Sequence, residues 1–243
     1  MEHFLDTVET ISPGLGFSLF SPVHLIWLGI GLAAILLCCR FYRRADSAGR
    51  ARWRKTAAAL LVADEVFKMV MLTIGGNYML KYLPFHLCSI NIFLIAIHAW
   101  KPSKLLGDFL YLVCIPGAIS ALLFHTWTSL PLNNFMHLHS FTVHILLTMY
   151  PVVLTAGGDI RPRGQDFFKC LLLLATMAVP IFFINLLCDT NFMFLMYAEP
   201  GNPLEWFQNA CGNHLIGFPV LIAAIMAVMY IPTRFMHKKP VKA

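Results

Sequence analysis

Long apolar segments, separated by short loops that hold most of the basic residues, constrain this chain more than any other feature. A membrane-spanning helix needs about 20 mainly apolar residues. Segments of roughly this length are Val23–Cys39, Ala57–Gly76, Pro84–Trp100, Leu105–Phe124, Ser140–Thr155, Phe167–Leu187 and His214–Ile231. We therefore predict an all-α, polytopic membrane protein with seven transmembrane helices, in a single domain over residues 1–243.

The composition agrees with this fold class. Of the 243 residues, 58% are hydrophobic and 12% are charged, and the mean hydropathy of +0.70 lies above that of soluble domains. The net charge of +6 would suit nucleic acid. However, the basic residues flank the apolar segments, so we expect membrane lipids and no nucleic acid as partners. The seven cysteines form no CxxC pair, and we expect neither a metal nor a cofactor.

The basic residues also predict the orientation, because Lys and Arg favour cytoplasmic loops. With the N-terminus outside and the C-terminus inside, all of the 18 Lys and Arg residues except Lys68 and Lys81 fall on the inner side. The inner loops hold the basic run that begins at Arg40, the Lys101–Lys104 turn, the loop with Arg161, and the C-terminal tail.

Histidines concentrate on the predicted outer side. Of the ten histidines, all but His98 and His237 fall in outer loops or at the outer ends of spans. His86 and His144 lie deepest, and polar groups there are costly unless they face a partner, a cavity or a substrate. We expect a His-rich polar cavity that opens to the outer leaflet. The alternative is a set of unrelated interfacial histidines.

His137 and His139, in the predicted outer loop, offer a second alternative. Together with His86, His144 or His214 they could hold a transition metal through their imidazoles. No HExxH motif supports such a site. We instead place His139 and His214 among the candidate substrate-binding residues.

The third span opens with several chemically active side chains. Cys88 and Ser89 are candidate nucleophiles, and Asn91 is a candidate substrate-binding residue. At ~100° per residue, Cys88 lies about 160° from His86 on a helix, so His86 cannot serve as its base. The base must come from another segment, and His144 is the first candidate. The alternative is that Cys88 only packs.

Three charges lie near the middle of the second span. Asp64 and Lys68 are four residues apart and can neutralise each other on one helix face, which leaves Glu65 in need of another partner or a proton. The group is either an ion pair that locks the helix to a neighbour or a proton relay.

The longest outer segment runs from Cys188 to Asn213 and contains no cation. Its aromatic residues predict a flap on the membrane surface, in which Asn191 and Trp206 are candidate substrate-binding residues. Cys188 and Cys211 flank the flap. They form either a disulfide, which the oxidising side would preserve, or two unrelated thiols.

The string Leu83-Pro84-Phe85-His86-Leu87-Cys88-Ser89-Ile90 resembles the signature of the YwaF-like family of bacterial integral membrane proteins. A second landmark of that family resembles Asn191-Phe192-Met193-Phe194-Leu195 with the following prolines and Trp206. More distantly, the family is similar to a eukaryotic transmembrane acyltransferase that builds polyunsaturated ether phospholipids. The resemblance implies a multi-pass protein of the bacterial cytoplasmic membrane.

The resemblance also implies site residues. The histidine of the relative's Pro-Cys-His sequence falls on His86, and its second histidine falls on His144, seven residues before Pro151. The relative's nucleophile position falls on Phe85, which cannot be acylated. Either Cys88 or Ser89 substitutes for it, or no acyl-enzyme forms.

Two functions follow as hypotheses. The first is an acyltransferase or lipid hydrolase in which His144 is the general base or acid, His86 a second proton carrier or oxyanion donor, and Cys88 or Ser89 the nucleophile. The second is a proton-coupled transporter or binding module for a small amphiphile, in which the histidines bind and the charges around Glu65 couple to protons. The sequence does not predict the oligomeric state.

Overall fold

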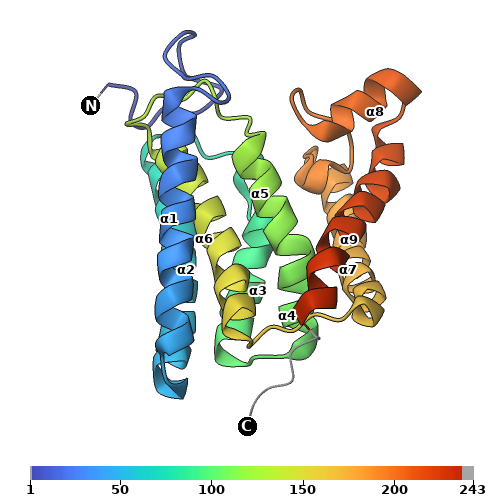
Figure 1. Cartoon of the computed structure of the whole chain (residues 1–243). Helices are drawn as coiled ribbons and strands as arrows, with labels where there is room; N and C mark the ends of the chain where they lie inside the picture. Colours follow the sequence, from blue (N-terminus) through green and yellow to red (C-terminus); the bar gives the residue numbers. More distant parts are fainter. Residues whose placement is uncertain (1, 237–243) are drawn as a thin grey trace.

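The computed structural model describes residues 2–236, and in this range it is helical without strands (Figure 1). His237 and the lysines after it, predicted on the inner side, lie outside the described residues. The long helices are α1 (Pro22–Arg44), α2 (Ser47–Ile74), α3 (Leu87–Trp100), α6 (Phe135–Gly157), α7 (Phe167–Cys188) and α9 (Gly217–Met236). The shorter elements are η1 (Leu80–Tyr82), α4 (Lys104–Phe109), η2 (Leu110–Cys114), α5 (Ile115–Leu123), η3 (Gly164–Asp166), η4 (Phe192–Phe194), α8 (Pro203–Cys211) and η5 (His214–Ile216).

Within the described range, six helical segments are long and apolar enough to cross a membrane. They are Pro22–Arg44, Leu80–Trp100, Lys104–Leu123, Phe135–Gly157, Gly164–Cys188 and His214–Arg234. The predicted second span is absent from this set, although α2 is 28 residues long. Its basic N-terminal part and its mid-helix charges lower its hydropathy.

Two helix starts differ from the sequence prediction. The third span does not begin at Pro84: the backbone of His86 is extended (φ −67°, ψ 149°), and α3 begins at Leu87. The fifth span begins earlier than Ser140, because the Asn134 side chain accepts hydrogen bonds from the N–H groups of Met136 and His137 and so caps α6. His137 and His139 are therefore helical and buried, not part of an outer loop.

Helix α6 occupies the centre of the bundle and is contacted by α1, α2, α3 and α5. Its side chains Phe141, Leu147 and Tyr150 have no exposed surface. Helices α7 and α9 stand beside this group (Figure 1): α7 contacts α4 and η2, and α9 contacts η2. The Tyr111 hydroxyl of η2 donates to the Met229 carbonyl oxygen of α9 at 3.0 Å.

Two prolines shape the core helices. Pro116 lacks the N–H that would bond to the Leu112 carbonyl, and the preceding residues Leu110–Cys114 form a π-helical turn. Pro151 likewise leaves the Leu147 carbonyl without its helical partner. The Cys114 thiol, 3.4 Å away, donates to that oxygen instead. The last residue of this π-turn therefore supplies the hydrogen bond that Pro151 removes from α6.

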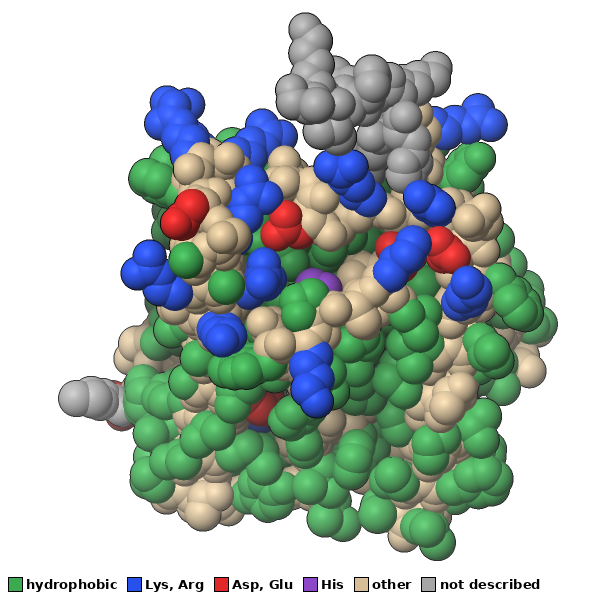
Figure 2. Space-filling view, turned by 90° about the horizontal axis from the view of Figure 1, so that it is seen from below, with side chains coloured by type: hydrophobic (Ala, Val, Ile, Leu, Met, Phe, Trp, Pro, Cys, Tyr) green, Lys and Arg blue, Asp and Glu red, His purple; other side chains and the backbone are tan. Residues whose placement is uncertain are grey.

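The two ends of the bundle differ in charge. The N-terminal segment and α8 lie at one end (Figure 1). The opposite end carries many Lys and Arg side chains, as Figure 2 shows. Of the two alternatives for Cys188 and Cys211, the structure shows the unpaired one, since both residues are free thiols.

Candidate functional site

Cys88 and His144 form a hydrogen-bonded thiol–imidazole pair between α3 and α6. Nε2 of His144 lies 3.2 Å from Sγ of Cys88, and Nδ1 of the same ring lies 2.6 Å from the carbonyl oxygen of Ser140. Because a carbonyl oxygen can only accept, Nδ1 carries the ring proton and Nε2 offers its lone pair to the thiol. The Trp127 ring stacks on His144, with centroids 5.4 Å apart and planes at 15°. The Ser140 carbonyl and the Trp127 ring therefore fix the orientation of the imidazole, with Nε2 toward the thiol.

The position of Cys88 in the first turn of α3 adds to this chemistry. The His86 side chain does not cap the helix. In the part of the chain that the structure describes, the N–H groups of Leu87 and Ser89 have no hydrogen-bond acceptor. Unpaired backbone N–H groups at the start of a helix can bind a developing oxyanion.

A group of polar side chains adjoins the pair, and we call it the charge cluster. It consists of Asp64, Glu65 and Lys68 from α2, Ser89 from α3, and His139 from α6. The Lys68 ammonium donates to Glu65 at 2.5 Å, and the Ser89 hydroxyl donates to the same Glu65 oxygen at 3.4 Å. Nδ1 of His139 lies 2.9 Å from a carboxylate oxygen of Asp64. Both atoms lack an aligned hydrogen bond.

The pairing within the charge cluster differs from the prediction. Lys68 contacts Glu65, three residues before it, rather than Asp64, four residues before it. Asp64 instead contacts His139, on the central helix α6. Glu65, which the sequence analysis left without a partner, is thus the residue that pairs with Lys68. Two carboxylates therefore share one ammonium and one imidazole as neighbours.

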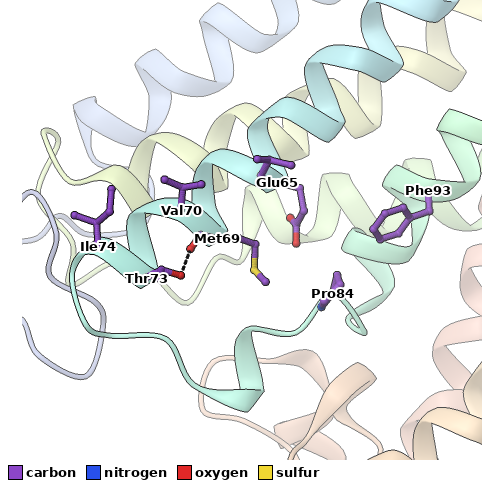
Figure 3. Close-up of a pocket in the computed structure, with 8 residues that line it drawn as sticks. Glu65, Met69, Val70, Thr73, Ile74, Pro84 and Phe93 are labelled. Carbon is purple, nitrogen blue, oxygen red and sulfur yellow. Dashed lines mark hydrogen bonds between the residues drawn. The ribbon is translucent and has the colours of Figure 1, made fainter.

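An apolar groove of about 420 Å³ opens beside the charge cluster, between α2 and the segment that leads into α3. Its lining residues are Glu65, Val66, Met69, Val70, Thr73, Ile74, Pro84 and Phe93. Figure 3 shows Glu65, Met69, Pro84 and Phe93 around the same space. Val66, Val70, Ile74 and Phe93 are exposed, so the groove opens on the outer surface of the bundle. Glu65 links it to Ser89, next to Cys88.

Comparison with protein families identifies the chain. The model of the TMEM164 family matches residues 19–230, which include the pair, the charge cluster and the groove. The chain belongs to the TMEM164 family. It is a multi-pass membrane protein of that family. No curated protein and no solved structure matched it.

His86 of this TMEM164-family chain does not share hydrogen bonds with His144. Its ring packs edge-on against Phe192, with centroids 5.2 Å apart, and against Phe194 at 5.9 Å. Among the described contacts it makes no hydrogen bond. The extended backbone at His86 turns its ring toward the loop after α7, and its catalytic assignment stays a prediction.

The two sequence landmarks meet at this point. Phe192, from the second landmark, has no exposed surface and also packs against Phe85 from the first, at 5.4 Å. The Asn191 side chain accepts from the N–H groups of Met196 and Tyr197 and donates to the Tyr197 carbonyl. Its amide therefore stabilises the loop, and its role in substrate binding stays a prediction.

The other predicted binding residues lie in different surroundings. Asn91 is 2% exposed, and its Oδ1 is buried without a hydrogen-bond partner. His214 is also buried, with its Nε2 unpaired. Its ring lies near Phe218 and makes no described contact with Cys88 or His144. Trp206 is 66% exposed and touches Phe207 on α8, and its role in substrate binding stays a prediction.

Three further histidines, His24, His125 and His137, pack around the Phe141 ring of α6. Nε2 of His24 donates to the Leu122 carbonyl at 2.8 Å, and His137 accepts from the Trp27 indole at 3.0 Å. His125 stacks on Phe17 with ring centroids 5.0 Å apart. These rings pack against aromatic neighbours.

Within the described range no group of three or more His, Cys, Asp or Glu residues is arranged to hold a metal.

Sequence reasoning missed two groups that hold His144. Ser140 lies one helical turn before His144, and this spacing is a usable signal, because a histidine Nδ1 can reach the carbonyl four residues earlier. Trp127 comes from the loop between α5 and α6, and no local pattern indicates its stacking. Glu65 was treated as unpaired, although it connects Lys68, Ser89 and the groove.

Proposed function

We propose that this chain is a membrane enzyme that transfers or hydrolyses a lipid acyl group, with Cys88 as nucleophile and His144 as general base. The observation that carries the proposal is the 3.2 Å hydrogen bond between the Cys88 thiol and Nε2 of His144. Ser140 and Trp127 fix the imidazole, as the third group does in other nucleophile–base pairs. The proposed nucleophile, Cys88, thus lies three positions after Phe85, where the resemblance places the relative's nucleophile.

The steps follow from this geometry. Nε2 of His144 takes the thiol proton as Sγ attacks the acyl carbonyl carbon, and the oxyanion lies near the free N–H groups of Leu87 and Ser89. Collapse releases the lipid alkoxide, which takes the proton from His144 and leaves a thioester on Cys88. A second alcohol gives transfer, and water gives hydrolysis. In either case the incoming group loses its proton to His144 and the thiol is restored.

The groove provides a place for the acyl chain. Its lining is apolar apart from Glu65 and Thr73, and it opens at the lipid-facing surface. A lipid held there contacts Glu65, whose carboxylate accepts a hydrogen bond from Ser89, the residue after the proposed nucleophile. Membrane lipids are accordingly the proposed substrates.

We also propose that α2 is a seventh span, with the N-terminus outside and the C-terminus inside. Its 28 residues extend ~42 Å at 1.5 Å per residue, which exceeds a ~30 Å hydrocarbon core. Its mid-helix charges contact Ser89, His139 and one another rather than lipid. The basic end in Figure 2 then faces the cytoplasm of a cell, and the pair lies toward the outer leaflet.

Thioester trapping tests the proposed chemistry. The full chain, in nanodiscs that contain a phospholipid with an alkyne-tagged acyl chain, should acquire a hydroxylamine-sensitive label on the Cys88 peptide. Cys88→Ala should abolish the label, and His144→Gln should slow its formation about 100-fold or more. Cys211→Ala removes an exposed thiol away from the pair and is the matched control. Lipid turnover by wild type without a label on Cys88 would contradict the acyl-enzyme.

A proton-coupled transporter for a small amphiphile is the second candidate, and the charge cluster favours it. Buried carboxylates beside an ammonium and an imidazole are typical of proton relays. In proteoliposomes, a transporter should take up an amphiphile in response to a pH gradient, and Glu65→Gln should stop this uptake while Cys88→Ala leaves it intact. The enzyme hypothesis predicts the opposite for acyl transfer: Cys88→Ala should lower its rate more than Glu65→Gln does.

A further inference from the structure

A second hollow, of about 440 Å³, lies at the basic end of the bundle, far from the thiol–imidazole pair. Its lining residues are Leu36, Cys39, Arg40, Arg43 and Arg44 of α1 and Ala156 of α6. Ala156 follows His144 by twelve positions on α6, which corresponds to ~18 Å along the helix. The hollow is therefore separate from the proposed active site.

The arginines of this hollow lack acidic partners. No carboxylate in the described chain pairs with Arg40, Arg43 or Arg44, whereas Arg50 and Arg54 on α2 both contact Asp159. Nε of Arg43 donates to the Ala156 carbonyl at 2.9 Å, which fixes this guanidinium at the wall of the hollow. Three guanidinium groups in one hollow, without a carboxylate partner among the described residues, favour a ligand with at least one negative charge.

The other half of the hollow is apolar. Leu36, Arg40 and Arg44 follow one another at intervals of four residues, so they form one stripe along α1. Leu36 is 60% exposed, and it lies on the membrane side of the arginines. The ligand that fits both halves has an anionic head beside the arginines and a hydrocarbon chain that runs along the helix past Leu36.

From this arrangement we infer that the hollow binds the headgroup phosphate of an anionic phospholipid in the leaflet at the basic end. A free phosphate or a soluble nucleotide would leave the stripe at Leu36 unused. A zwitterionic lipid would bring its own cation toward three arginines that have no carboxylate partner in the described chain. Basic pockets between transmembrane helices on the cytoplasmic side bind anionic headgroups by the same physics.

Native mass spectrometry of the full chain, released from nanodiscs of mixed phosphatidylglycerol and phosphatidylcholine, tests the inference. The wild type should retain phosphatidylglycerol. The double variant Arg40→Gln, Arg44→Gln leaves the Arg43–Ala156 hydrogen bond in place and should lower this retention about 25-fold, since each interfacial cation contributes about fivefold. The charge-preserving double variant Arg40→Lys, Arg44→Lys should retain more lipid than the glutamine variant, and it checks the site if the glutamine variant unfolds.

The matched control is Arg52→Gln, Lys101→Gln, which removes the same charge from two exposed residues outside the hollow. It should retain phosphatidylglycerol as the wild type does. Equal losses in the two glutamine variants would show a diffuse surface effect and overturn the site. Retention unchanged in the Arg40, Arg44 variant would overturn it as well. Displacement of phosphatidylglycerol by millimolar inorganic phosphate would overturn the assignment to a lipid.

Discussion

At the residue scale, the site depends on backbone groups that hold side chains in place. His144 is oriented by the Ser140 carbonyl, and Cys88 by the first turn of α3. The charge cluster is different, because its members neutralise one another directly. Removing one partner there leaves a buried charge with no counter-ion, which costs far more than the pair contributes.

The Glu65–Lys68 pair gives the first prediction. Lys68→Met should lower the free energy of unfolding by roughly 3 kcal/mol, because the Glu65 carboxylate is stranded. The double variant Glu65→Gln, Lys68→Met should recover most of this loss. Chemical unfolding in detergent measures both.

The surface pair Lys81–Glu9 is the control for this experiment. Its side chains are 44% and 36% exposed, and Lys81→Met should change stability by less than about 1 kcal/mol. Equal damage from Lys68→Met and from the double variant would show that Glu65 has a role besides neutralising Lys68.

His125 gives a pH-dependent prediction. Burial, and then the nearby His24, lower the pKa of His125 to about 4 from 6.5, partly offset by its hydrogen bond with the Leu122 carbonyl, with His137 adding a smaller lowering. The folded state therefore holds His125 neutral, whereas the unfolded chain binds a proton below pH 6.5. Stability from this group is present above pH 6.5 and is lost as pH falls toward 4.

Thermal unfolding at pH 7 and pH 5 measures this effect. The wild type should lose about 1 to 2 kcal/mol from His125 at pH 5. His125→Gln, which cannot titrate, should show a smaller loss between the two pH values. An identical pH dependence in the variant would mean that another group is responsible.

At the scale of elements, the prolines of the core helices create carbonyls that neighbours must satisfy. The π-turn Leu110–Cys114 ends at the residue whose thiol reaches the Leu147 carbonyl, left free by Pro151. The residue that ends the π-turn before Pro116 therefore supplies the hydrogen-bond donor that Pro151 removes from α6. This arrangement also holds α6 in the position where His144 meets Cys88.

Cys114→Ala tests the compensation. The substitution leaves the Leu147 carbonyl without a donor in an apolar interior, and we expect it to lower stability by about 1 kcal/mol more than Cys170→Ala. Cys170 is equally buried and has no described hydrogen bond, so it removes the same atoms without stranding a carbonyl. Equal effects in the two variants would show that the Cys114 hydrogen bond contributes nothing to stability.

At the scale of the whole molecule, the basic residues gather at one end of the bundle, and the preference of Lys and Arg for the cytoplasmic side predicts the orientation. The pair and the groove lie away from the basic end, where the arginine hollow is found. If α2 spans the membrane, the loops on its two sides lie in different compartments. If it does not, both loops lie on one side.

Labelling with a membrane-impermeant maleimide distinguishes these cases. In intact cells, Cys211 and the substitution Tyr78→Cys should be labelled, while Ser47→Cys and Lys101→Cys should react only after lysis, each introduced into a chain whose other accessible thiols are removed. Labelling of Ser47→Cys and Tyr78→Cys from the same side would exclude α2 as a span.

Local hydropathy was enough to predict the all-helical membrane class and most of the apolar segments. The few chemically active residues inside spans made His144 the first candidate base for Cys88. The packing of the helices was needed to show which groups meet: His144 with Cys88, Lys68 with Glu65, and His86 with Phe192. The helix starts at Leu87 and Phe135 were not predicted either, because they depend on the extended backbone of His86 and on the Asn134 cap. Hydropathy reports where a segment lies in a membrane, whereas contacts between helices depend on their rotation and depth, which packing sets.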